Sequence, residues 1–231
     1  MAGHPGKMDG QSKDRKYIQN RKHWCWAAAC RIVGEQYRRH HAGFEFEIIN
    51  ETPTKPGQVT EREYEKGVAT GDLEGINWNL QDGFPVRVDA WQRAIVMNAN
   101  TAMGAGYEGD IAGDDEAKAR GIKYFLTGNP DTDRLEVETL GWIGSEIPLP
   151  VKYEDRMMES FRRKEYIIGN AVFLGKNEFH SFVILCMEQD WVMLYDPADG
   201  RIMYHKAAKV YREGFGCSMG TGVIKWIQRI V

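Results

Sequence analysis

Hydrophobic and polar positions follow two different periods along this chain, helical near its start and strand-like in its last third. Residues 24–39 contain three consecutive alanines, which are strong helix formers, and continue with apolar residues at helical spacing as far as Tyr37. In the last third, apolar runs at 180–187 and 191–195 flank the polar turn 188–190, which is typical of a β-hairpin. The pattern predicts an early helix and a late antiparallel hairpin.

The other segments with a clear pattern support the same fold class. Helices are expected at 89–99, 116–120, 153–164 and 207–213, and strands at 121–126, 135–140, 166–174 and 223–230. Helices in the first part of a chain and antiparallel strands in its last part predict an α+β fold.

Composition excludes several classes of function. A net charge of −3 does not supply the strongly basic face that nucleic acids require, so no nucleic-acid partner is expected. No apolar run approaches the roughly 20 residues of a membrane span. Residues 1–16 lack the apolar core of a secretory signal. The cytoplasm is therefore the default location, and export by a route that needs no cleavable signal stays open.

Four cysteines are scattered along the chain, at Cys25, Cys30, Cys186 and Cys217. They have no CxxC spacing, so neither a disulfide framework nor a metal site is expected, and no cofactor is implied. Five residues on a helix correspond to about 140° around its axis, which separates Cys25 from Cys30. Each cysteine is therefore considered as a single thiol.

Cys25 stands where a polar, aperiodic loop becomes a helix. The unpaired N–H groups and the dipole at a helix start favour a negative charge, and the thiolate is the nucleophilic form of cysteine. Six residues earlier, the side-chain amide of Gln19 can donate to a developing oxyanion, with the Cys25 N–H as a second donor. This pattern predicts a catalytic thiol with its oxyanion hole.

The same stretch resembles a known family. A glutamine six residues before the Trp-Cys-Trp-Ala-Ala core at 24–28 resembles the papain-like cysteine peptidases. It looks closest to the bacterial branch that contains double-glycine leader peptidases of bacteriocin exporters and papain-like effector peptidases of plant pathogens. The resemblance implies a papain-like fold, in which the nucleophile helix packs against an antiparallel sheet. It also implies a catalytic His that opens one strand and an Asp that ends the next, where His180 and Asp196 stand.

The hairpin pattern supports this pair independently of the resemblance. If the hairpin turns symmetrically about Gln189, residue 182 faces Asp196, and His180 is its diagonal neighbour on the same face. Diagonal neighbours lie about 7–8 Å apart at the backbone, a distance that a His and an Asp can bridge. A shift of one residue would move Asp196 to the other face. Asp199 and Asn170 are the alternative orienting groups.

These residues together predict a cysteine peptidase that acts on a protein or peptide substrate. Cys25 attacks the peptide carbonyl, His180 serves as base and acid, Asp196 orients the imidazole, and water hydrolyses the thioester. Two alternatives remain open. The same residues can perform deamidation, transglutamination or peptidyl transfer in an effector or toxin, and a papain-like fold can serve as a binding module without catalysis.

The expected domain organisation is a flexible arm at 1–16 followed by a single papain-like catalytic domain at 17–231. Residues 44–150 match no motif, so this region is expected to be an insertion that lines the substrate groove or forms a lid. Gly216-Cys217-Ser218-Met219-Gly220 matches G-x-S-x-G, but the strand pattern that follows excludes a hydrolase elbow. The acidic run at 110–116 lacks the ligand spacing of a calcium loop and is expected to be solvated.

Overall fold

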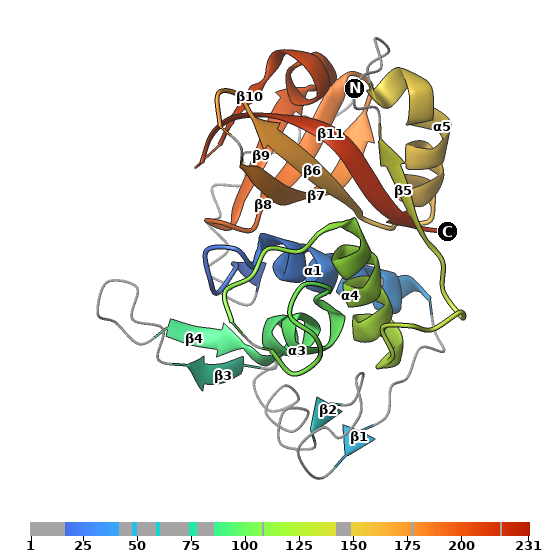
Figure 1. Ribbon diagram of the computed structural model, residues 1–231. Coiled ribbons are helices and arrows are strands. Elements are labelled where there is room, and N and C mark those ends of the chain that lie inside the picture. Colours follow the sequence, from blue (N-terminus) through green and yellow to red (C-terminus); the bar gives the residue numbers. More distant parts are fainter. Residues whose placement is uncertain are drawn as a thin grey trace.

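The scaffold of the fold is a curled, seven-stranded antiparallel sheet built from the second half of the chain (Figure 1). Its strands are β5 (Val137–Gly141), β6 (Ile167–Phe173), β7 (Phe179–Glu188), β8 (Trp191–Asp196), β9 (Arg201–Lys206), β10 (Phe215–Cys217) and β11 (Gly220–Ile230). The order across the sheet is β10-β11-β6-β7-β8-β9, and β5 pairs with the last residues of β11. The sheet is therefore formed largely by neighbours in sequence.

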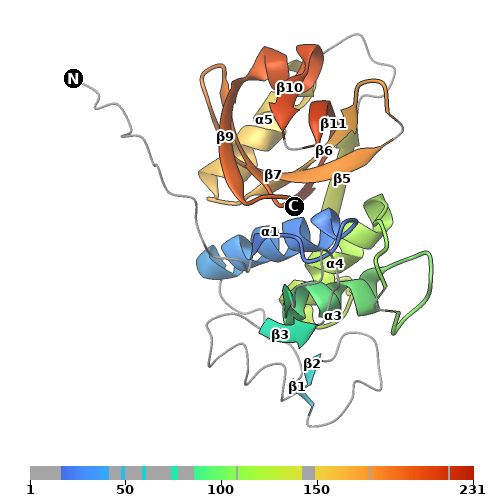
Figure 2. The same cartoon turned by 90° about the vertical axis from the view of Figure 1, so that its left-hand side faces the viewer.

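Three helices lie on one side of this sheet and a fourth covers its other face (Figures 1 and 2). The first group is α1 (Cys25–His40), α3 (Ala90–Ala99) and α4 (Asp115–Thr127). The opposite face carries α5 (Leu149–Arg162) and the short π-helical segment η2 (Lys209–Glu213). Two small pairs of strands complete the first half: β1 (Ile48–Ile49) with β2 (Val59–Thr60), and β3 (Glu74–Asn77) with β4 (Val86–Asp89).

This computed structural model describes residues 17–41, 48–49, 59–60, 74–77, 86–107, 109–141, 149–176, 178–217 and 219–231. The expected arm at 1–16 lies outside these ranges. Among the described helices, none is both long enough and apolar enough to cross a membrane.

Alternation along the strands produces two hydrophobic cores, one on each face of the sheet. Val183 and Tyr195 point toward the helices α1, α3 and α4, whereas their neighbours Phe182 and Ile184 point toward α5 and η2. All four side chains are buried. A sheet covered on both faces explains why β6, β7 and β8 read as nearly continuous apolar runs in the sequence.

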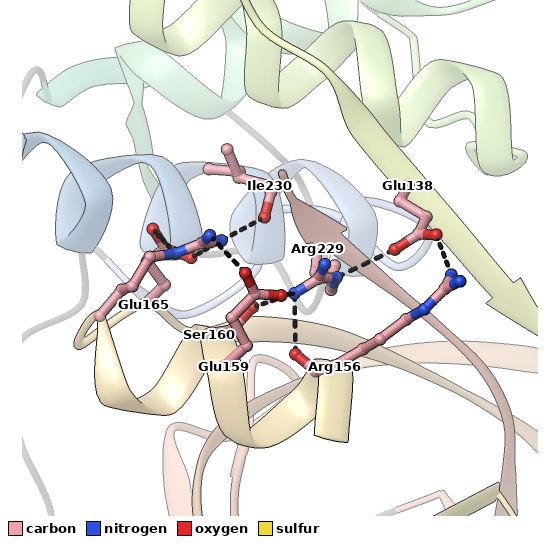
Figure 3. A network of polar contacts seen from close by, with 8 residues as sticks. Glu138, Arg156, Glu159, Ser160, Glu165, Arg229 and Ile230 are labelled. Carbon is pink, nitrogen blue, oxygen red and sulfur yellow. Dashed lines mark hydrogen bonds and ion pairs between the residues drawn. The ribbon is translucent and has the colours of Figure 1, made fainter. Parts of the chain in front are cut away.

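Hydrogen bonds and ion pairs of charged side chains connect α5 to the sheet (Figure 3). The buried guanidinium of Arg229 on β11 donates to Glu138 on β5 at 3.0 Å and to Glu159 on α5 at 2.9 Å. Arg163, directly after α5, donates to the Ile230 carbonyl at 2.9 Å. These contacts join β11 to β5 and α5 through pairs of residues more than 60 positions apart in the chain.

The structure confirms the early helix at α1, the hairpin formed by β7 and β8, and the α+β class. The strand expected at 121–126 is wrong, because these residues continue the helix α4 to Thr127. Asp114 caps the start of α4 and Gly128 ends it with a left-handed conformation. The apolar residues 122, 125 and 126 have helical spacing, and the short apolar run concealed that period.

The middle region contributes to the core as well as to the surface. The helices α3 and α4, from within the segment 44–150, pack against α1 through buried residues such as Ile95 and Phe125. These two helices of the predicted insertion therefore support the helix that begins at Cys25. A role for this region as a lid or groove stays a prediction.

Candidate active site

The helix α1 begins at Cys25, as the sequence predicts. Trp24 precedes it with a non-helical backbone, and its carbonyl accepts the first helical hydrogen bond from the Ala28 N–H at 3.0 Å. No side chain caps this end of the helix. The first-turn N–H groups therefore favour a negative charge at this end of the helix, where Cys25 stands.

His180 and Asp196 meet at the open end of the β7–β8 hairpin. The His180 Nε2 lies 2.7 Å from the Asp196 Oδ1, and both side chains are almost completely buried. Asp196 also accepts a hydrogen bond from the Ala198 N–H at 2.9 Å. The rings of Phe173 and Phe182 lie beside the imidazole, so the pair sits in an apolar environment.

The register that brings the pair together depends on a β-bulge. The turn contains two residues, so that Glu188 pairs with Trp191, and the symmetric turn about Gln189 is therefore wrong. A bulge between Ile184 and Cys186 then shifts the pairing by one residue. Beyond the bulge Val183 pairs with Tyr195, and the same register continues to place residue 182 opposite Asp196. Without the bulge, Asp196 would point to the other face.

Cys25 contacts the same imidazole from the start of α1. Burial would raise the pKa of the Cys25 thiol, but the charge of His180 and a hydrogen bond from its ring lower it. The Ser181 N–H donates a further hydrogen bond to the sulfur. Because Nε2 is engaged by Asp196, the Nδ1 of His180 is the nitrogen left for Cys25.

The pKa of His180 moves in the opposite direction. Burial would lower it, but the negative charge of Cys25 and the hydrogen bond to Asp196 raise the pKa of His180 to about 10. A lowered thiol pKa beside a raised imidazole pKa favours the thiolate–imidazolium pair at neutral pH. The structure thus brings Cys25, His180 and Asp196 into one buried, charge-coupled group.

Gln19 lies in the loop before Cys25, beside the end of β8. Its backbone N–H donates to the Pro197 carbonyl at 2.7 Å, which ties this loop to the residue after Asp196. Its side-chain Nε2 donates to the carbonyls of Arg21 at 3.1 Å and Lys22 at 2.8 Å. The amide therefore stabilises the loop, and an oxyanion role for Gln19 requires release of one of these bonds. That role stays a prediction.

The two tryptophans beside Cys25 hold a loop from the middle region. The indole N–H of Trp24 donates to the Gly109 carbonyl at 2.9 Å, and that of Trp26 donates to the Ile111 carbonyl at 3.0 Å. Asp110, from the acidic run expected to be solvated, accepts a bond from the His23 N–H at 2.8 Å. The loop 109–113 is thereby fixed against the start of α1.

A buried polar chain behind the site was not predicted as a unit. The Ser181 hydroxyl donates to the Asn170 Oδ1 at 2.9 Å, and the Asn170 amide lies 3.5 Å from the Gln228 Oε1. The Gln228 amide donates to the Asp115 carbonyl at 2.7 Å. This chain fixes the strand segment whose N–H faces Cys25. Asn170, an alternative orienting group for His180, belongs to this chain, and Asp199 pairs with Arg201.

The other cysteines differ from Cys25 in their electrostatic environment. Burial raises the pKa of Cys30, and burial together with the charge of Glu188 raises that of Cys186. All four cysteines are free thiols. Within the described ranges, no cluster of His, Cys, Asp and Glu is arranged to hold a metal ion.

No protein-family model, curated protein or solved structure matches this chain.

Proposed function

We propose that this protein is a cysteine peptidase that hydrolyses an amide bond of a peptide or protein through a thioester at Cys25. The observation that carries the proposal is the buried contact of His180 with both Asp196 and Cys25, which moves the two pKa values in opposite directions. An inert buried cysteine has a raised pKa, as Cys30 does here. The position of Cys25 at an uncapped helix start adds to its activation.

The catalytic cycle follows from this arrangement. The Cys25 thiolate attacks the carbonyl carbon, and the oxyanion that forms is stabilised by N–H groups at the start of α1. The protonated His180 gives its proton to the leaving amine as the C–N bond breaks. His180 then takes a proton from water, which attacks the thioester and releases the carboxylic acid. Asp196 keeps the ring oriented and stabilises its positive charge throughout.

Iodoacetamide labelling as a function of pH tests the activated thiol, with peptide mass mapping to identify the modified cysteine. We expect Cys25 to react well below the pH of about 8–9 at which ordinary thiols ionise. In His180→Ala, burial is the largest remaining influence, so the labelling midpoint should rise above that of an ordinary thiol. Cys186→Ala is the matched control and should leave the labelling of Cys25 unchanged.

Incubation with a diverse peptide mixture tests the reaction itself. New peptide termini that form with the wild type and are absent with Cys25→Ala support hydrolysis. A mass change of the peptides without new termini would instead assign deamidation or transfer to the same residues. Labelling spread evenly over the four cysteines, together with intact peptides, would contradict an enzymatic role and favour a binding module.

A further inference from the structure

Lys118 on α4 is a buried lysine near the candidate active site that the mechanism above does not use. Its side chain is 5% exposed, which is rare for a lysine and costly unless the charge has a partner. The carboxylate of Asp115 lies 3.3 Å away, but it is itself 46% exposed and also accepts the indole N–H of Trp226 at 2.6 Å. This long, partly solvated ion pair compensates the buried ammonium only in part.

Two contacts place Lys118 between α1 and the strand β11. Its carbonyl accepts a hydrogen bond from the Cys30 thiol at 3.2 Å, which fixes this turn of α4 against the nucleophile helix. Its ammonium lies 5.9 Å from the centre of the Trp226 ring. Trp226 pairs across the sheet with Asn170, and Asn170 pairs with Ser181, whose N–H binds the Cys25 sulfur. The Lys118 ammonium therefore lies near Trp226, in the cross-strand row that ends at Ser181 beside the Cys25 sulfur.

The charges of the site explain why a cation is useful there. A thiolate at Cys25, an imidazolium at His180 and a carboxylate at Asp196 sum to one negative charge. All three side chains are at least nine-tenths buried. A net charge in such an environment is costly, whereas a nearby cation brings the buried group to neutrality. Lys118 supplies a buried cation from α4, and its charge lowers the pKa of the Cys25 thiol less than that of His180 does.

We propose that Lys118 is a positioning residue of this site, whose buried ammonium holds the Cys25 sulfur in its anionic form together with His180. The titratable groups around the ammonium are Asp115 on its own helix, Cys25 and Cys30 on α1 and, beyond Cys25, the ring of His180. Because burial keeps Cys30 protonated, Cys25 is the thiol whose ionisation the lysine assists. The inference rests on the proposed function only in requiring an activated Cys25.

The test is the pH dependence of Cys25 labelling by iodoacetamide in lysine variants. Iodoacetamide is neutral, so the lysine cannot attract the reagent. In Lys118→Met we expect the midpoint to rise by about 0.5–1 pH unit and labelling below the midpoint to slow about 3–10-fold. Lys118→Arg keeps the charge and should restore the wild-type profile, which a purely structural role does not require. Lys123→Met on the same helix is the control and should change nothing.

A second variant changes the charge in the opposite direction. Asp115→Asn removes the carboxylate that competes for the ammonium while its amide oxygen can still accept from Trp226. We expect labelling below the midpoint to become about 1.5–3-fold faster, since less of the lysine charge is compensated. Circular dichroism establishes that each variant is folded, and this variant decides the question if Lys118→Met does not fold.

The outcomes separate this inference from the proposed function. Suppose that Cys25 of the wild type labels at low pH. The role of Lys118 is then overturned if the labelling midpoint is unchanged in Lys118→Met, or if labelling is not faster in Asp115→Asn. A wild-type profile that rises only near pH 8–9, as an ordinary thiol does, overturns the proposed function as well.

Discussion

At the scale of single residues, the negative charge of Asp196 is the feature of the site that can be removed with the least change in shape. In Asp196→Asn the amide oxygen can still accept from His180, but the imidazolium loses its buried counter-charge. We expect a fall of up to about 10⁴-fold in peptide hydrolysis, the loss that the same substitution causes in a Ser-His-Asp triad. The pKa of His180 should also fall, because the hydrogen bond and charge of Asp196 raise it. Hydrolysis of a cleaved peptide, followed by mass spectrometry, measures the loss.

Asp199→Asn is the matched control for this substitution. Asp199 lies three residues away and is 29% exposed, and its carboxylate pairs with Arg201 at 2.5 Å. We expect it to retain nearly full activity. An equal loss in both variants would show that the effect reflects the loop after β8 rather than an orienting role of Asp196.

The residues of the site differ in how far they could be predicted. Cys25 was accessible because its signal is local: an alanine-rich helix start preceded by a polar loop. The contact of His180 with Asp196 depends on the register of the β7–β8 hairpin. The observed turn differs from the predicted symmetric turn by one residue, and the bulge between Ile184 and Cys186 restores the predicted register beyond it. Lys118 could not be predicted, because it reaches the site only through the packing of α4 against β11, which leaves no periodic trace in the sequence.

At the scale of elements, the close packing of α1 on α4 keeps Cys25 in place. A Cβ at Gly34 would overlap the ring of Phe125, which is itself packed edge-on against Trp91. In Gly34→Val we expect the free energy of unfolding to fall by about 1–3 kcal/mol, because overpacking displaces the ring. Thermal or urea unfolding measures the change. Gly216→Val on β10 is the control, since a Cβ there meets nothing within 4 Å.

The elements also show which patterns in the sequence were ambiguous. The helix α1 lies within one residue of its predicted bounds, whereas β11 ends where predicted but begins three residues earlier. The segment 121–126 is too short to separate a helix from a strand, because its apolar residues fit either period. The caps at Asp114 and Gly128 show that it belongs to one helix. The short strand β10 and the exposed edge strand β9 carry too weak an alternation to be detected.

At the scale of the whole molecule, the two faces of the sheet are connected through β11. On the face toward α4, the side chains of Trp226 and Gln228 donate to Asp115 at the start of that helix, beside the candidate site. On the opposite face of the strand, the Arg229 guanidinium donates to the Arg156 carbonyl and the Glu159 carboxylate of α5 (Figure 3). The strand thus links the supports of the site to the helix on the far face. Because such a link joins segments more than 60 residues apart, it could not be predicted from local patterns.

Removal of the Arg229 guanidinium tests how much of the fold depends on this link. Its side chain is 5% exposed, and its partners Glu138 and Glu159 are 24% and 50% exposed. In Arg229→Met we expect a loss of about 1–3 kcal/mol, less than the 3–5 kcal/mol typical of a fully buried pair, because water can partly solvate both carboxylates. For a chain of this size, each kcal/mol lowers the Tm by about 2–4 °C. Arg212→Met is the control, since Arg212 is 63% exposed and pairs with Glu213 at the surface. If the two variants unfold at the same temperature, α5 is held by its apolar contacts, and the charged network adds no stability of its own.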